Sequence, residues 1–184
     1  MRIFSYHIRE GHCRADTDAV LLRCAENFAQ AAEKPVPKRI FHTESGKPYV
    51  KESGIFIGAA HTEKILFAAA CDVPFGIDAE SIKRDVRGAS KIAEKYFFDE
   101  ERALLKNGKR TFAELWTAKE AFLKLTGEGL AGLRRANTAS LPYAFEYIGF
   151  SDVLICVCSE NPVKDISVAP FELTEENPGF VKTF

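Results

Sequence analysis

Two carboxylates stand two residues apart in a short apolar stretch, at Asp78 and Glu80. If residues 74–80 form a strand, both side chains point to the same face. Like charges this close repel each other unless a cation or a proton lies between them. The pair suits Mg²⁺, which a few carboxylates bind while water and phosphate oxygens fill its other positions. The simpler interpretation, that both residues end a strand at the surface, stays open because this spacing is common.

A third carboxylate, Glu120, lies in the stretch 116–130, which has the pattern of a helix closed by a glycine cap at Gly127. Glu120 and Lys124 are one helical turn apart on the flank of an apolar stripe. Lys119 lies near the middle of that stripe, where a charge must pair, snorkel or meet a ligand. The stripe consists of Phe112, Leu115, Trp116, Phe122 and Leu123.

Other polar residues give weaker signals. His61 follows an apolar run, where a lone histidine is usually structural, although it could also donate a hydrogen bond to a phosphate. Lys47, in a Gly-Lys-Pro turn, is more often an ordinary turn lysine. His7, His12 and Cys13 fit no strong zinc signature.

The predicted elements that would position these residues are strands followed by helices and then strands. Strands are expected at 2–8, 39–42, 55–60, 65–71, 74–80, 143–150, 153–158 and 166–170, and a turn at 177–179. Helices are expected from Asp16 or Thr17 to about residue 32, within the basic segment 82–110, where Asp99 can cap a short helix, and from about Thr111. Because no long βαβ alternation occurs, the predicted fold class is α+β with antiparallel sheets.

Composition narrows the function classes. A chain of 184 residues suits one domain, or two small halves that share a core. The formal net charge of −1 argues against bulk electrostatic binding to nucleic acid. No apolar run is long enough to cross a bilayer, and no secretory signal is recognised. The five cysteines are scattered and odd in number, which favours a reducing compartment. We therefore expect a cytoplasmic protein without a nucleic-acid or membrane partner.

These pieces together closely resemble the 4′-phosphopantetheinyl transferase superfamily. Residues 75–80 read F-G-I-D-A-E, and residues 116–130 read W-T-A-K-E-A-F-L-K-L-T-G-E-G-L. They resemble the family motifs G-[IV]-D-x-E and W-[ST]-x-K-E-[AS]-x-x-K-x-x-G-x-G-L, and every fixed position of the second motif matches. The Gly-Lys-Pro turn at Lys47, His61 and the aromatic-acidic segment 97–101 also resemble family elements.

The resemblance covers roughly residues 40–132 and has one departure. The family usually has an Asn-x-Ser-His segment, whereas Gly58 and Ala60 stand here at the Asn and Ser positions before His61. The change removes polar contacts near the phosphates of coenzyme A. It bears on the affinity for coenzyme A more than on catalysis.

The resemblance implies a fold as well. Residues 1–184 would form a single transferase unit with approximate halves 1–73 and 74–184. Each half would be a long helix packed on a small antiparallel sheet, and a pseudo-twofold axis would relate the two. This is the pseudo-dimeric type named after the surfactin synthetase activator, which is expected to work as a monomer.

The resemblance also implies an activity: transfer of the 4′-phosphopantetheine group from coenzyme A to a serine of an apo acyl or peptidyl carrier protein, releasing adenosine 3′,5′-bisphosphate. Mg²⁺, or Mn²⁺, would be held by Asp78, Glu80 and Glu120. Glu120 would take the serine proton, and Lys124 would stabilise the leaving phosphate. The residues expected to contact coenzyme A are Lys47, Pro48, His61, Thr62, Asp78, Lys119 and Lys124. An acidic carrier protein would dock near the basic segment 82–110.

Two other functions remain open from the sequence. A non-catalytic module that binds coenzyme A or a carrier protein is supported only by the altered residues Gly58 and Ala60. A metal-dependent nuclease or phosphohydrolase would also use acidic pairs beside a lysine. The near-neutral charge counts against a nuclease, since phosphate-backbone binding requires a basic surface.

Overall fold

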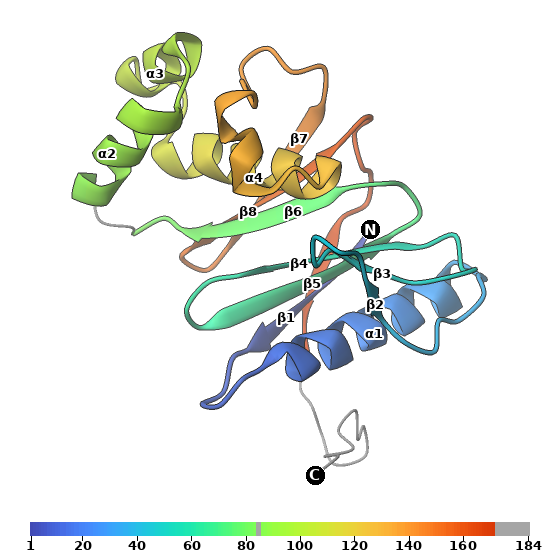
Figure 1. Ribbon diagram of the computed structural model, residues 1–184. Coiled ribbons are helices and arrows are strands. Elements are labelled where there is room, and N and C mark those ends of the chain that lie inside the picture. Colours follow the sequence, from blue (N-terminus) through green and yellow to red (C-terminus); the bar gives the residue numbers. More distant parts are fainter. Residues whose placement is uncertain (84–85, 172–184) are drawn as a thin grey trace. The chain divides into compact units, whose positions relative to one another are not determined.

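The computed structural model describes residues 1–83 and 86–171. It confirms the α+β class and divides the chain into two compact units (Figure 1). Unit 1 contains Met1–Pro74 together with the chain from Val163 onward, and unit 2 contains Phe75–Pro162. The turn expected at 177–179 lies outside the described residues, as do Arg84 and Asp85 of the basic segment.

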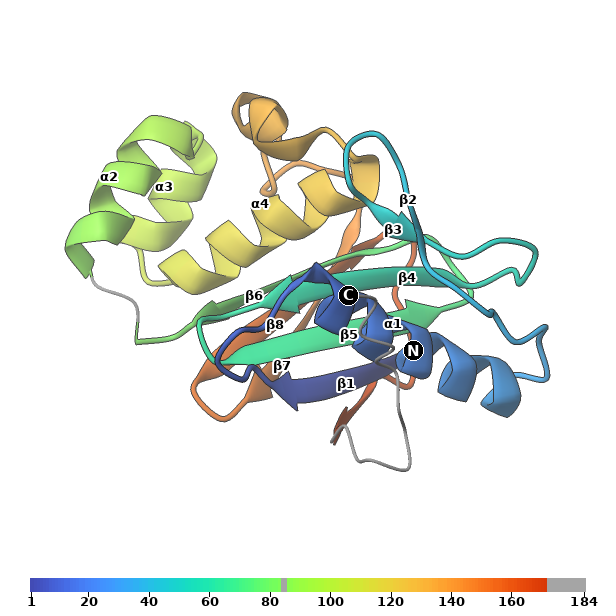
Figure 2. The ribbon, with the colours of Figure 1, turned by 60° about the horizontal axis from the view of Figure 1, so that its bottom comes forward.

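Unit 1 consists of the long helix α1 (Arg14–Ala31) on a four-stranded sheet, which Figure 2 shows from the helix side. The strands run in the order β4 (Phe56–His61), β5 (Ile65–Cys71), β1 (Arg2–His7) and β9 (Ser167–Pro170). β1 and β4 pair antiparallel with β5, whereas β9 pairs parallel with β1. A separate hairpin consists of β2 (Phe41–His42) and β3 (Pro48–Tyr49).

The alanine run in β5 is explained by the packing of α1. Alanine favours helices when nothing else decides, yet Ala68 and Ala70 are fully buried in a strand, in one core cluster with Cys24 and Ala25 of α1. The Cys24 thiol donates a hydrogen bond to the Ala68 carbonyl oxygen at 3.3 Å. Small side chains on both elements allow this approach, so the tertiary contact overrides local propensity.

Unit 2 packs three helices beside a three-stranded antiparallel sheet (Figure 1). The strands follow the order β6 (Gly76–Ser81), β8 (Val153–Ser159), β7 (Ala144–Phe150). The helices are α2 (Val86–Tyr96), α3 (Asp99–Lys106) and α4 (Phe112–Thr126), and the 3₁₀ helix η1 (Gly129–Arg134) follows. The core forms between α4 and the sheet, where Trp116 and Phe122 share a cluster with Cys156 and Cys158.

Two helices begin earlier than predicted. The helix expected to start after Asp16 or Thr17 begins at Arg14, because the Asp16 carboxylate reaches back to accept the Cys13 N–H at 2.7 Å. Asp99, expected to cap α3, is instead its first residue, and the Glu101 carboxylate accepts the Phe98 N–H at 2.8 Å. In both cases an acidic residue in the first turn satisfies a free donor at the helix end.

The last described strand, β9, belongs to the first unit, although the expected halves 1–73 and 74–184 place it in the second. β9 pairs with β1, Arg2 opposite Ser167 and Ser5 opposite Pro170, so this part of the chain belongs to unit 1. The sheet of unit 1 is therefore mixed, whereas the sequence predicted a purely antiparallel sheet. A strand at this position could be predicted from its apolar residues, but its partner strand could not, since pairing joins residues far apart in the chain.

Candidate active site

Strand β6 positions the two carboxylates Asp78 and Glu80. In the antiparallel pairing with β8, Asp78 lies opposite Cys156 and Glu80 opposite Leu154. Asp78 is buried, with 6% of its surface exposed, whereas Glu80 is half-buried and accepts the Ser81 N–H at 3.0 Å. The same strand therefore offers one carboxylate shielded from water and a second nearer to the surface.

Helix α4 lies against this strand and begins and ends as predicted. Its first turn is closed by Thr111, whose hydroxyl accepts the Glu114 N–H at 3.2 Å. Its last turn ends at Gly127, which has φ of 76° and so favours glycine. Gly76 of β6 faces the helix backbone, and a Cβ there would lie only 1.9 Å from the Ala121 carbonyl oxygen. The helix that carries Glu120 and Lys124 is thus in close backbone contact with the strand that carries Asp78.

Asp78 and Lys124 form an ion pair, with 2.7 Å between Oδ1 and Nζ. The Asp78 side chain is 8% exposed and that of Lys124 is 39% exposed. Burial raises the pKa of the Asp78 carboxyl, and the charge and hydrogen bond of Lys124 oppose this rise. Asp78 is therefore a carboxylate that water hardly reaches and that is stabilised by a nearby positive charge.

The three expected metal ligands do not form a preassembled cluster. Among residues 1–83 and 86–171, no group of three or more His, Cys, Asp or Glu side chains is arranged to hold a metal ion. The donor chemistry nevertheless fits Mg²⁺, because Asp78 and Glu80 lie on one strand, and Glu120 lies on the helix that packs against it. The buried Asp78 in particular has little water to stabilise its charge, which favours a cation beside it.

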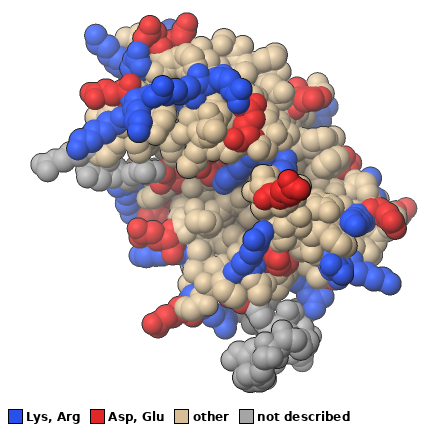
Figure 3. All heavy atoms as spheres, in the orientation of Figure 1, with Lys and Arg blue, Asp and Glu red and all other residues tan. Residues whose placement is uncertain are grey.

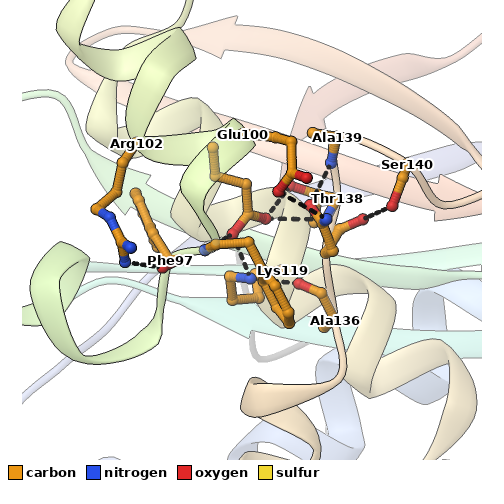
Figure 4. A network of polar contacts seen from close by, with 11 residues as sticks. Phe97, Glu100, Arg102, Lys119, Ala136, Thr138, Ala139 and Ser140 are labelled. Atoms are coloured by element: carbon orange, nitrogen blue, oxygen red, sulfur yellow. Dashed lines mark hydrogen bonds and ion pairs between the residues drawn. The ribbon is translucent and has the colours of Figure 1, made fainter.

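Lys119 is placed differently from the expected phosphate contact. Its side chain is fully buried, and its ammonium lies 2.8 Å from the Glu101 carboxylate of α3. It also donates to the Ala136 carbonyl oxygen, as Figure 4 shows. A phosphate could reach this ammonium only if the pair with Glu101 opened. The geometry thus places Lys119 in the interior of unit 2.

The remaining expected residues lie on two hairpins of unit 1. Lys47 precedes β3, and its N–H donates to the Thr43 hydroxyl at 3.0 Å. Burial lowers the pKa of the Lys47 ammonium. Pro48 lies opposite His42 in the β2–β3 pairing. A half-buried ammonium of this kind is suited to binding an anion.

His61 and Thr62 lie at the turn between β4 and β5. His61 is exposed at the end of β4. The Thr62 hydroxyl accepts the Ile65 N–H at 3.2 Å, and its N–H donates to the Ile65 carbonyl oxygen at 2.9 Å. His61 thus presents an exposed imidazole at the strand end, whereas Thr62 closes the turn.

Two groups were missed by the sequence interpretation. His42 contacts the Asp18 carboxylate through Nε2 at 2.9 Å and the Gly46 carbonyl oxygen through Nδ1 at 3.2 Å, and so supports the turn that carries Lys47. Thr138 donates its N–H and hydroxyl to the Glu101 carboxylate, at 2.8 and 2.6 Å. The pairs His42–Asp18 and Thr138–Glu101 have no signal in local spacing, because their members lie 24 and 37 positions apart in the chain.

One negative finding concerns membranes: no helix in the described part of the chain has the length and apolar character needed to cross a bilayer.

The family model and the relatives that match this chain all carry the same description, 4′-phosphopantetheinyl transferase. Residues 74–156 match the family model described as the 4′-phosphopantetheinyl transferase superfamily. The chain is 39% identical over 115 residues to 4′-phosphopantetheinyl transferase psf-1 of Bacillus pumilus, a match that covers 58% of this chain and 48% of that protein. It is 29% identical over 154 residues to 4′-phosphopantetheinyl transferase HetI of a Nostoc strain, covering 75% of this chain and 63% of that protein.

A third relative is 4′-phosphopantetheinyl transferase gsp of Aneurinibacillus migulanus, 34% identical over 93 residues, which cover 47% of this chain and 37% of the relative. The chain thus spans about half the length of the curated relatives it matches. The matched region contains β6, α4 and both motifs of unit 2. On these matches, residues 74–156 of the chain are similar to the 4′-phosphopantetheinyl transferase superfamily.

Proposed function

We propose that this protein transfers the 4′-phosphopantetheine group of coenzyme A to a serine hydroxyl of an apo acyl or peptidyl carrier protein, in a reaction that depends on Mg²⁺ and releases adenosine 3′,5′-bisphosphate. The family match supports the class of reaction. The observation that carries the assignment to this site is the ion pair between the buried Asp78 and the partly exposed Lys124, formed where α4, the helix that also carries Glu120, packs on β6.

Asp78, Glu80 and Glu120 are the residues that would hold Mg²⁺. The bound ion would neutralise the pyrophosphate of coenzyme A and so reduce its repulsion of an attacking hydroxyl. Asp78 is suited to this role because burial keeps competing water away from its carboxylate. Glu80 and Glu120 are half-buried, which leaves them accessible to a ligand that approaches from solvent.

Glu120 is the proposed general base. A serine hydroxyl is a weak nucleophile and needs a group that removes its proton. Glu120 follows Lys119 directly in the sequence of α4. Because the Lys119 side chain is fully buried, it anchors this part of the helix in the core. Replacement of such a base costs on the order of 10² to 10⁴ in rate.

Lys124 is the proposed phosphate contact. The Lys124 side chain is partly exposed while its ammonium pairs with Asp78, so the ammonium can also contact a phosphate that approaches from solvent. It would stabilise the charge that develops on the leaving phosphate oxygen as the bond to the pantetheine phosphate breaks. At the nucleotide end of coenzyme A we propose Lys47, Pro48, His61 and Thr62 as contacts.

The carrier protein is proposed to be acidic and to dock near the basic segment 82–110. Over the face drawn in Figure 3, basic side chains lie beside acidic ones, so complementarity would come from local clusters and not from a uniform field. We further propose that the protein is a cytoplasmic monomer of the pseudo-dimeric type. The five free cysteines are consistent with a reducing compartment.

The decisive experiment is intact-protein mass spectrometry of an apo acyl carrier protein after incubation with this protein, coenzyme A and Mg²⁺. The expected result is a gain of one phosphopantetheine group that is lost with EDTA and with Glu120→Ala. Binding of coenzyme A without transfer to several carrier proteins would contradict the proposal and favour a binding module. Release of phosphate or nucleotide without a carrier protein would favour a phosphohydrolase.

A further inference from the structure

The ion pair between Glu101 and Lys119 is closed off from solvent completely. Both side chains have 0% exposure, and Lys119 Nζ lies 2.8 Å from Glu101 Oε2. Removal of two charges from water costs several kcal/mol per ion, and apolar residues of similar volume often stabilise a core equally well or better. Stability by itself is therefore a weak explanation for this pair. The segments that the pair connects indicate another role.

The pair joins three separate segments of unit 2, as Figure 4 shows. The Glu101 carboxylate accepts hydrogen bonds from the Phe98 N–H at 2.8 Å and from the N–H and hydroxyl of Thr138. The Lys119 ammonium also donates to the Ala136 carbonyl oxygen. Helix α3, helix α4 and the chain after η1 are thus fixed to one another through charged, directional contacts that have few alternative arrangements.

Helix α4 is held on its other side by strand β6. A Cβ at Gly76 would lie 1.9 Å from the Ala121 carbonyl oxygen and 2.5 Å from the Leu125 nitrogen. This backbone contact sets how close the helix lies to the strand. Apolar side chains of the helix, Trp116 and Phe122 among them, pack in one cluster with Cys156 and Cys158 of the sheet. The buried Lys119 adds a charged, directional restraint on the rotation of the helix, because its ammonium pairs with Glu101 of α3.

Glu120 follows Lys119 directly, and Lys124 lies within the next turn and a half of the same helix. We propose that Glu101 is a positioning residue that acts through Lys119 to fix the rotation of α4, and thereby directs Glu120 and Lys124 toward the face of β6 that carries Asp78. The proposal rests on the proposed transferase function of this site. Misplacement of catalytic groups by about 1 Å can reduce a rate about a hundredfold, so a modest helix rotation would be measurable.

The main test is the double variant Glu101→Gln with Lys119→Met. It removes both charges together, and so avoids an unpaired buried charge, and the glutamine amide oxygen can still accept a hydrogen bond from Thr138. The single variant Lys119→Met leaves the Glu101 charge uncompensated and is expected to have a lower melting temperature than the double variant. The transfer rate, the KM for coenzyme A and the melting temperature are measured for each protein.

For the double variant we expect kcat to fall between about ten- and a hundredfold while the KM for coenzyme A stays within about twofold of the wild-type value. A structural pair without a positioning role would leave kcat unchanged once the variant is folded. Wild-type kcat in the folded double variant would overturn the proposal. So would a rise in KM that accounts for the whole loss, since the pair would then act on binding.

A milder variant keeps the test decisive if the double variant does not fold. Thr138→Val removes only the hydroxyl that donates to Glu101 at 2.6 Å and preserves side-chain shape. We expect a smaller fall in kcat, about threefold or more, again with unchanged KM; wild-type kcat in this folded protein would overturn the proposal. The matched control is Glu26→Gln, which breaks a partly exposed ion pair with Arg23 of the same 2.8 Å length in α1 and should leave kcat unchanged.

Failure of this inference is distinguishable from failure of the proposed function. If the wild-type protein transfers no phosphopantetheine to any carrier protein, the proposed function fails before any variant is compared. If the wild type is active and the folded variants keep its kcat, the function stands, and Glu101 and Lys119 serve only the stability of the core.

Discussion

Gly76 of β6 and Ala121 of α4 meet backbone to backbone, so closely that a Cβ on Gly76 would lie 1.9 Å from the Ala121 carbonyl oxygen. This contact brings the helix that carries Glu120 and Lys124 against the strand that carries Asp78. The glycine of the Gly-Ile-Asp motif is therefore explained by helix packing and not by an unusual backbone angle.

Gly76→Ala is expected to push α4 away from β6. Overpacking of this kind typically costs about 1–3 kcal/mol, and the larger separation would also reduce the transfer rate. The measurements are urea unfolding and the transfer assay. Gly88→Ala is the control, because Gly88 lies within α2 with no atom within 4 Å of an added Cβ, and alanine there should maintain or raise stability. Equal stabilities of the two variants would contradict the close contact.

Asp78→Asn is expected to separate function from stability. The substitution preserves the side-chain shape but removes a carboxyl whose pKa is raised by burial. The folded protein therefore no longer bears the free-energy cost of keeping that charge away from water. We expect a melting temperature equal to or above the wild-type value, together with a transfer rate reduced by about a hundredfold or more. A variant that melts far lower, or that keeps full activity, would show that Asp78 has a structural role instead.

Lys124→Met is expected to affect stability only through Asp78. Loss of the ammonium leaves a buried carboxylate without its partner at 2.7 Å, so unfolding at neutral pH should require less urea. In the Asp78→Asn background the same substitution should have little effect on stability, because no charge remains to be compensated. A double-mutant cycle measures this coupling. Additive effects would mean that the ion pair contributes nothing to stability. The rate of transfer should be low in every protein that carries Lys124→Met.

Mg²⁺ is expected to stabilise the wild-type protein against heat. Binding to the folded state alone adds about 2.7 kcal/mol when the free ion is at a hundred times its Kd. The increase in melting temperature should be reversed by EDTA and should be absent in Asp78→Asn, which retains the shape of the site but lacks the charge. An equal increase in both proteins would locate the bound ion away from Asp78.

Glu114 provides a dependence of stability on pH that is independent of the active site. Burial acts to raise the pKa of the Glu114 carboxyl, but hydrogen bonds from Thr111 and Arg110 outweigh it, and the net pKa is lowered from 4.5. Because the folded-state pKa lies below the unfolded one, the stabilisation is present above about pH 4.5 and is lost as the pH falls through the lowered value.

The test compares the wild-type protein with Glu114→Gln by urea unfolding across this range. The free energy of unfolding of the variant should be lower at pH 7, and the two proteins should converge in acid as the wild-type carboxylate is protonated. A difference that stays constant with pH would show that the charge of Glu114 is not responsible. Glu160→Gln, a change at an exposed residue between strands, serves as a control for the general effect of removing one carboxylate.

Local patterns in the sequence determined much of unit 2. The apolar stripe, the Thr111 cap and Gly127 predicted α4, because helix ends and periodicity depend on residues within a few positions of one another. In unit 1, β5 was predicted at 65–71 and found as Ile65–Cys71, although its alanine run, which favours a helix locally, is held as a strand by packing against α1. The two motifs around Asp78 and Glu120 also predicted the resemblance to the superfamily whose model matches residues 74–156, since the residue types that phosphate and metal chemistry requires occur there at fixed spacing.

Only the tertiary structure decided which side chains and strands pair with one another. Lys119 lies on the expected stripe, but only the fold brings Glu101, Thr138 and the Ala136 carbonyl oxygen around it, which turns an expected phosphate contact into a buried anchor. The pairing of β9 with β1 likewise joins residues more than 160 positions apart. Such contacts have no local signal, because they are selected by burial and hydrogen bonding in the assembled core and not by the preferences of neighbouring residues.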